Sequence, residues 1–148
     1  MHLHRLTRFV TAVLTISGLG CTDYSFRDKI GVNGVELIKI DGNGQSVSAF
    51  RPGLFDLVVL GDGNTVQIPC GSAIRNLMVS GVNHHISGLP GASVQFIRLS
   101  GTDTVIHLPA NVHPSVQGSG VNNRVLNDID DVGRDCPAGA NTTTGQTK

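Results

Sequence analysis

The chain has 148 residues and a formal net charge of zero, with eleven Lys and Arg balanced by eleven Asp and Glu. Without a basic excess there is no charge to track a phosphate backbone, so the composition disfavours a nucleic-acid partner. Glycine supplies 19 residues and Trp is absent. Because glycine weakens helices and favours tight turns, a helix bundle is also disfavoured. The hydrophobic fraction of 39% is too high for a wholly disordered chain.

Residues 1–20 have the layout of a secretory signal peptide. Arg5 and Arg8 form a positive segment, residues 9–16 form an apolar one, and residues 17–20 are mostly small. The apolar run is too short to span a membrane, which takes about 20 residues. We therefore expect the protein to be exported and this segment to be removed.

Cys21 follows this segment directly and stands where a bacterial lipobox has its acylated cysteine. Gly20 fits the small residue before such a cysteine, whereas Gly18 occupies the place of the usual Leu. Gly18 and Gly20 also suit ordinary signal peptidase, so three outcomes stay open. The first is a lipoprotein of the cell membrane or outer membrane, with palmitate or a similar lipid on Cys21. The second is a periplasmic or secreted protein, and the third is a protein that retains its N-terminus.

Three cysteines are an odd number for an exported protein. With Cys21 acylated, Cys70 and Cys136 remain as a pair that can form a disulfide in an oxidising compartment. A buried Cys70 and a free thiol at Cys136 are the alternative. We favour the disulfide, because Cys70 falls at an expected corner and the stretch before Cys136 is long enough to fold back beside it.

Residues 36–127 contain five copies of a unit of 19 or 20 residues. Each copy has an apolar run, a turn of Gly, Asn and Asp, and a short β-branched run. One apolar anchor recurs in the β-branched runs, and a second precedes it by nine residues. The first anchors are Val47, Val66, Ile86, Val105 and Val125, and the second are Ile38, Leu57, Leu77, Phe96 and Val116.

A unit of this length cannot bury its apolar side chains alone, so the copies must stack on one another. The sequence therefore predicts an all-β fold, a short parallel β-helix or β-solenoid of about five coils. A β-sandwich made of hairpins is the alternative. Residues 21–35 are expected to form a tether and N-terminal cap, and residues 128–148 a C-terminal cap and flexible tail. The residues expected to point inward in one column are Val66, Ile86, Val105 and Val125.

Residues 60–66, with the sequence LGDGNTV, resemble the G-x-x-N-T-V unit of a bacterial family of exported proteins of unknown function. Members of that family carry several such units behind a signal peptide, often that of a lipoprotein. The resemblance covers residues 36–127, and the other copies depart from the Asn-Thr pair. It implies a solenoid and an exported location, and it brings no catalytic residues to this chain.

Stacking aligns one polar turn position from each coil, where side chains can hydrogen-bond from coil to coil. We interpret this ladder as structural and assign no catalytic residues. A general base formed by His84 and Asp103 is the alternative, but no nucleophile is aligned beside them. The ladder positions are Gln45, Asn64, His84, Asp103 and Asn123.

The histidines form no recognisable metal motif. His84 and His85 are neighbours that point to opposite faces, and His107 and His113 are out of register with them. Residues 62–64 lack the tandem nine-residue units of a calcium-binding roll. We therefore expect no metal site and no cofactor.

These observations favour an exported structural or binding module of the cell envelope over an enzyme. The expected partners are the membrane, through the lipid anchor, and an envelope protein or polysaccharide. A carbohydrate-binding or carbohydrate-active β-helix is the alternative, and such enzymes use paired carboxylates and aromatic side chains that stack on sugars. The aromatic residues after the signal peptide are Tyr24, Phe26, Phe50, Phe55 and Phe96, the last of which is expected in the core.

Overall fold

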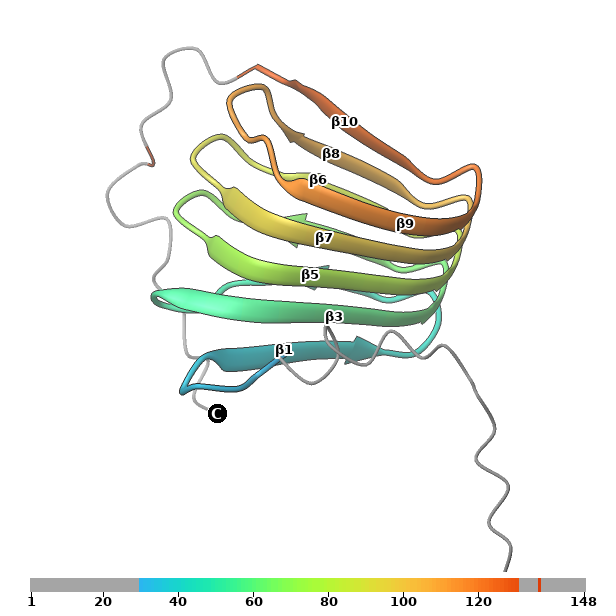
Figure 1. Ribbon diagram of the computed structural model, residues 1–148, viewed down its shortest axis with the longest axis horizontal. Coiled ribbons are helices and arrows are strands. Elements are labelled where there is room, and N and C mark those ends of the chain that lie inside the picture. Colours follow the sequence, from blue (N-terminus) through green and yellow to red (C-terminus); the bar gives the residue numbers. More distant parts are fainter. Residues whose placement is uncertain (1–29, 131–135, 137–148) are drawn as a thin grey trace, which may run out of the picture.

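The computed structural model describes residues 30–130 and residue 136, and the regular structure of these residues is all β-strand. Each of five coils contains one long strand and one short strand (Figure 1). The long strands are β1 (Glu36–Asp41), β3 (Leu54–Asp62), β5 (Ala73–Val82), β7 (Ser93–Thr102) and β9 (Ser115–Val121). The short strands are β2 (Ser46–Ser48), β4 (Thr65–Ile68), β6 (His85–Gly88), β8 (Val105–Pro109) and β10 (Arg124–Ile129).

The strands form two parallel sheets, with the long-strand sheet in front and the short-strand sheet behind it (Figure 1). The long strands follow the order β1-β3-β5-β7-β9, and the short strands follow β10-β8-β6-β4-β2. Each strand pairs with its equivalent one coil away, about 19 or 20 residues along the chain. Parallel neighbours need a crossover rather than a hairpin. The predicted β-solenoid of about five coils is therefore confirmed, and the sandwich of hairpins is wrong.

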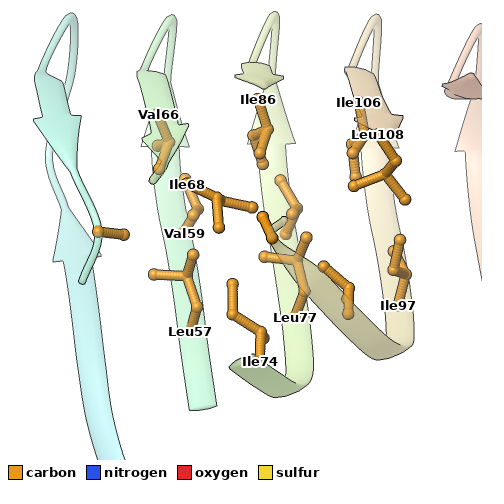
Figure 2. Close-up of a cluster of buried hydrophobic side chains, with 14 of the residues drawn as sticks. Leu57, Val59, Val66, Ile68, Ile74, Leu77, Ile86, Ile97, Ile106 and Leu108 are labelled. Atoms are coloured by element: carbon orange, nitrogen blue, oxygen red, sulfur yellow. The ribbon is translucent and has the colours of Figure 1, made fainter. Parts of the chain in front are cut away.

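The core lies between the two sheets, where equivalent apolar side chains stack in columns (Figure 2). In the central coils the inward side chains are buried, whereas at the two ends they are partly exposed because no described strand covers them. Each buried Val, Leu or Ile contributes about 1.5–3 kcal/mol relative to an exposed one. One column contains Val47, Val66, Ile86, Ile106 and Val125, and the facing one contains Ile38, Leu57, Leu77, Ile97 and Val116.

The fourth coil differs from the expected alignment by one residue. Ile106, not Val105, lies in the inward column and is fully buried. Ile97 likewise takes the inward position expected for Phe96, and Phe96 is 46% exposed on the outer face. A shift of one residue moves every side chain of a strand to the opposite face. The assignments of Val105 and Phe96 to the core were therefore wrong.

A four-residue glycine turn joins the long strand of each coil to its short strand. It comprises residues 42–45, 61–64, 81–84, 101–104 and 120–123. Its first glycine has a positive φ in every coil, for example 133° at Gly81. A Cβ atom on Gly81 would lie 1.7 Å from the carbonyl oxygen of Gly61 in the preceding coil. Only glycine allows the coils to approach this closely.

Candidate functional site

Asn64 is fully buried in the glycine turn and joins two coils. Its Oδ1 accepts a hydrogen bond of 2.9 Å from the backbone N–H of Gln45. Its Nδ2 donates to the carbonyl oxygens of Gly42 and Leu60, each at 2.9 Å. Asn123 makes the equivalent three hydrogen bonds in the last coil. These contacts support the structural interpretation of the ladder, because they satisfy backbone groups that would otherwise be buried without a partner.

His84 occupies the same position in the third coil and is 1% exposed. Its Nδ1 lies 3.3 Å from the backbone nitrogen of Asn64, and its Nε2 lies 3.3 Å from the carbonyl oxygen of Ser80. An N–H group needs an acceptor and a carbonyl needs a donor, so the proton of the ring lies on Nε2. In the third coil, the imidazole of His84 thus takes the place that the side-chain amide of Asn64 or Asn123 has in the other coils.

Asp103 does not belong to the ladder, which contains Thr104 in the fourth coil. Asp103 has a positive φ of 56°, the conformation of Asn83 and Asn122 at the same turn position. Its carboxylate accepts a hydrogen bond of 3.0 Å from the side chain of Asn122. Both ring nitrogens of His84 are bonded to backbone groups instead. The placement of Asp103 in the ladder beside His84 was therefore wrong.

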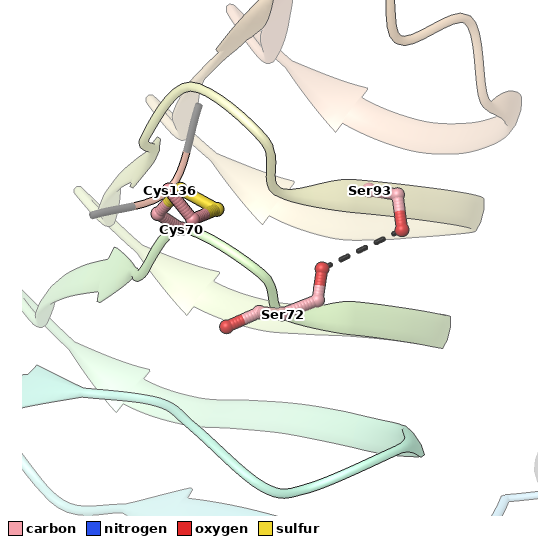
Figure 3. The surroundings of a disulfide bond; sticks show 4 residues. All are labelled: Cys70, Ser72, Ser93 and Cys136. Carbon is pink, nitrogen blue, oxygen red and sulfur yellow. Dashed lines mark hydrogen bonds between the residues drawn. A yellow bond between two sulfur atoms is a disulfide. The ribbon is translucent and has the colours of Figure 1, made fainter. Parts of the chain in front are cut away.

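Cys70 and Cys136 form a disulfide at the corner between β4 and β5, with their Cα atoms 5.5 Å apart (Figure 3). The bond lies against Gly91, where a Cβ atom would be 2.8 Å from Sγ of Cys136 and 2.9 Å from Sγ of Cys70. It connects a residue beyond the last coil to the middle of the solenoid. For a sequence separation of 66 residues, chain entropy gives a contribution of about 4 kcal/mol.

Asp56 is a fully buried carboxylate that lies opposite a β-bulge in β5. Arg75 donates to it from Nη2 at 2.7 Å and from Nε at 3.1 Å. Asn76 donates from its backbone nitrogen at 3.1 Å and from Nδ2 at 2.9 Å. At the bulge the backbone N–H of Asn76 donates to the carboxylate of Asp56 rather than to a carbonyl oxygen of β3.

The same carboxylate holds the N-terminal segment on the solenoid. The backbone N–H of Gly31 donates to Oδ2 of Asp56 at 2.6 Å, and Nη2 of Arg75 donates to the carbonyl oxygen of Val32 at 3.3 Å. Burial raises the pKa of Asp56, but the hydrogen bonds from Arg75, Gly31 and Asn76 together outweigh it and lower the pKa below its ordinary value of 3.8. We call Asp56, Arg75, Asn76 and Gly31 the carboxylate clamp.

His85, His107 and Asp128 form a cluster on the outer face of the short-strand sheet. The ring centroids of His85 and His107 are 5.2 Å apart, with an angle of 49° between the planes. Nδ1 of His107 lies 2.9 Å from both carboxylate oxygens of Asp128. His107 is out of register with His85, as expected, but the two rings still meet diagonally across β6 and β8. The signal in the sequence was their spacing of one coil plus two residues, which keeps both on one face.

Cys21 lies outside the described residues, as do the expected signal peptide and most of the tail. No protein-family model, curated protein or solved structure matches this chain. Among residues 30–130 there is no helix with the length and apolar character needed to cross a membrane.

Proposed function

We propose that this protein is an exported structural or binding module of the cell envelope, anchored by a lipid on Cys21, and is not an enzyme. The disulfide between Cys70 and Cys136 is the observation that carries the proposal. Structural disulfides persist in oxidising compartments outside the cytosol. This bond also uses two of the three cysteines, and Cys21 is the thiol that remains for acylation.

The carboxylate clamp supports a tethered module, because it fixes the point at which the chain leaves the solenoid. Gly31 is held on Asp56, and residues 22–30 separate it from Cys21. A stretch of this length spans at most about 33 Å. The anchored Cys21 would therefore keep the clamp, on the long-strand sheet, within about that distance of the membrane surface.

A hollow beside the glycine turns favours carbohydrate binding as the second candidate. It has a volume of about 490 Å³, and its amides, carboxylate and guanidinium match the hydroxyl groups of a sugar. Binding to envelope polysaccharide that is lost in the double variant Asp103→Asn, Arg124→Gln would support this candidate. The lining residues are Asn83, Asp103, Val105, Asn122 and Arg124.

Fractionation of cells that express the full chain tests the proposed anchor. The wild-type protein is expected in the membrane fraction and labelled by a fatty-acid probe, whereas Cys21→Ser is expected to be soluble and unlabelled. The double variant Cys70→Ser, Cys136→Ser is the control and should remain in the membrane fraction. A soluble wild-type protein whose N-terminus lies downstream of Cys21 would refute the anchor.

A further inference from the structure

Two imidazole rings lie side by side on the outer face of the short-strand sheet, away from the clamp and the disulfide. His85 on β6 is paired with Val105, and His107 on β8 is paired with Ser87. The two rings therefore occupy diagonal positions on one face, with a centroid distance of 5.2 Å. His85 is exposed, and the side chain of His107 is 27% exposed, so solvent reaches the pair.

Asp128 fixes the orientation of one ring. Its two oxygens lie 2.9 Å from Nδ1 of His107. An ionised carboxylate only accepts hydrogen bonds, so Nδ1 carries a proton. In the neutral ring this leaves the lone pair on Nε2, the atom available to a metal ion. A carboxylate on the far nitrogen is the usual device that orients a histidine ligand.

The spacing of the rings matches a shared ion. Zinc binds imidazole nitrogens at about 2.0–2.1 Å, and two rings on one tetrahedral ion have centroids about 5 Å apart. We propose that His85 and His107 bind a divalent transition-metal ion of the zinc or copper class, with Asp128 positioning His107. This proposal does not depend on the lipid anchor.

The ligand type determines which ions fit. Imidazole suits zinc and copper, whereas calcium and magnesium prefer oxygen ligands. Among the residues that the structure describes, no group of three or more His, Cys, Asp or Glu is placed to hold an ion. The site therefore supplies two protein ligands, and water or a donor group from a partner completes the coordination.

Calorimetric titration of the full chain with zinc, copper and calcium tests the site. His2 and His4 are replaced by Asn in every sample, so that the N-terminal histidines do not bind metal. We expect one zinc or copper ion per chain and no calcium binding. His85→Asn and His107→Asn should each weaken zinc binding at least about 10-fold, and Asp128→Asn should weaken it about 10- to 100-fold. His113→Asn is the matched control at another exposed histidine and should leave the affinity unchanged.

Circular dichroism on each variant separates loss of the site from loss of the fold, and these outer-face substitutions should leave the spectrum unchanged. The absence of binding at millimolar zinc would overturn the proposal. Zinc binding that persists in both His85→Asn and His107→Asn would overturn it as well. An unchanged affinity in Asp128→Asn would overturn the positioning role of that residue.

Discussion

The contacts of the glycine turns repeat from coil to coil, whereas those on the outer surface of the same coils do not. Asn64 and Asn123 make the same three hydrogen bonds three coils apart. Among the described residues, the carboxylate clamp, the disulfide at the corner between β4 and β5, and the pair of His85 and His107 each occur once. A turn residue contacts its equivalents above and below and must fit both, whereas an outer side chain can differ from its neighbours in the adjacent coils. Stacking therefore depends on the repeated positions, and specific chemistry is found at the others.

The largest expected effect on stability is the difference between an inward and an outward substitution in the fourth coil. Ile106→Asp should cost more than about 5 kcal/mol and prevent folding, because it places an unpaired charge among buried side chains. Val105→Asp, one residue earlier on the outer face, should cost less than about 1 kcal/mol. Urea denaturation of both variants measures the difference. Equal destabilisation would contradict the alignment of this coil.

The glycine turn offers the next largest effect. Gly81→Ala should cost at least about 3 kcal/mol, because its Cβ meets the Gly61 carbonyl oxygen and its φ is strained. Gly63→Asn is the matched control, since Asn83 and Asn122 adopt the same positive φ at equivalent positions. It should change the free energy of unfolding by less than about 1 kcal/mol. Thermal melts compare the two variants, and a stable Gly81→Ala would contradict close stacking at this turn.

The carboxylate clamp should have the next largest effect on stability. Asp56→Asn should cost about 3 kcal/mol at neutral pH, because it leaves Arg75 without its charged partner. Asp41→Asn is the control, since the ion pair with Lys39 is more than half exposed and should contribute less than about 1 kcal/mol.

The clamp also predicts a dependence on pH. The pKa of Asp56 is lowered on folding, so its stabilisation is fully present above the ordinary value of 3.8 and is lost as pH falls through the lower folded value. The difference in unfolding free energy between the wild type and Asp56→Asn should therefore shrink below about pH 4. Denaturation curves recorded from about pH 2 to about pH 7 measure this difference in unfolding free energy. A difference that is independent of pH would contradict the charged clamp.

The smallest expected effect tests whether His84 serves only as a substitute for Asn. His84→Asn should change stability by less than about 1 kcal/mol, because Asn64 and Asn123 make the equivalent contacts. His84→Ala should cost about 2 kcal/mol, since it leaves the buried N–H of Asn64 without an acceptor. Equal losses in the two variants, measured by chemical denaturation, would show that the imidazole has a role that an amide cannot fill.

The period of the repeat was sufficient to predict the solenoid, but not the alignment of every coil. In the fourth coil two apolar residues stand side by side, as Phe96-Ile97 and Val105-Ile106. Either member of each pair continues a spacing of 19 or 20 residues, so periodicity alone does not choose between them. The hydrogen-bonded register of β7 and β8 decides in favour of Ile97 and Ile106.

The candidate sites were harder to predict, because each depends on side chains that meet in only one place. Asp56 and Arg75 are one period apart, but their contact requires a bulge that the repeat does not indicate. His85 and His107 are one coil plus two residues apart, and a comparison of equivalent positions alone misses this diagonal. The disulfide was easier to predict, because the odd number of cysteines, with Cys21 set aside, already indicated the pair Cys70 and Cys136.

The mass of the protein purified from envelopes, alkylated without reduction, tests the central claim most directly. An exported, lipid-anchored module is expected to begin at Cys21, to carry the added mass of acyl chains there, and to take up no alkyl group. Reduction before alkylation should then label Cys70 and Cys136. A chain that starts elsewhere without a lipid, and that carries alkyl groups on Cys70 and Cys136 before reduction, would contradict the account.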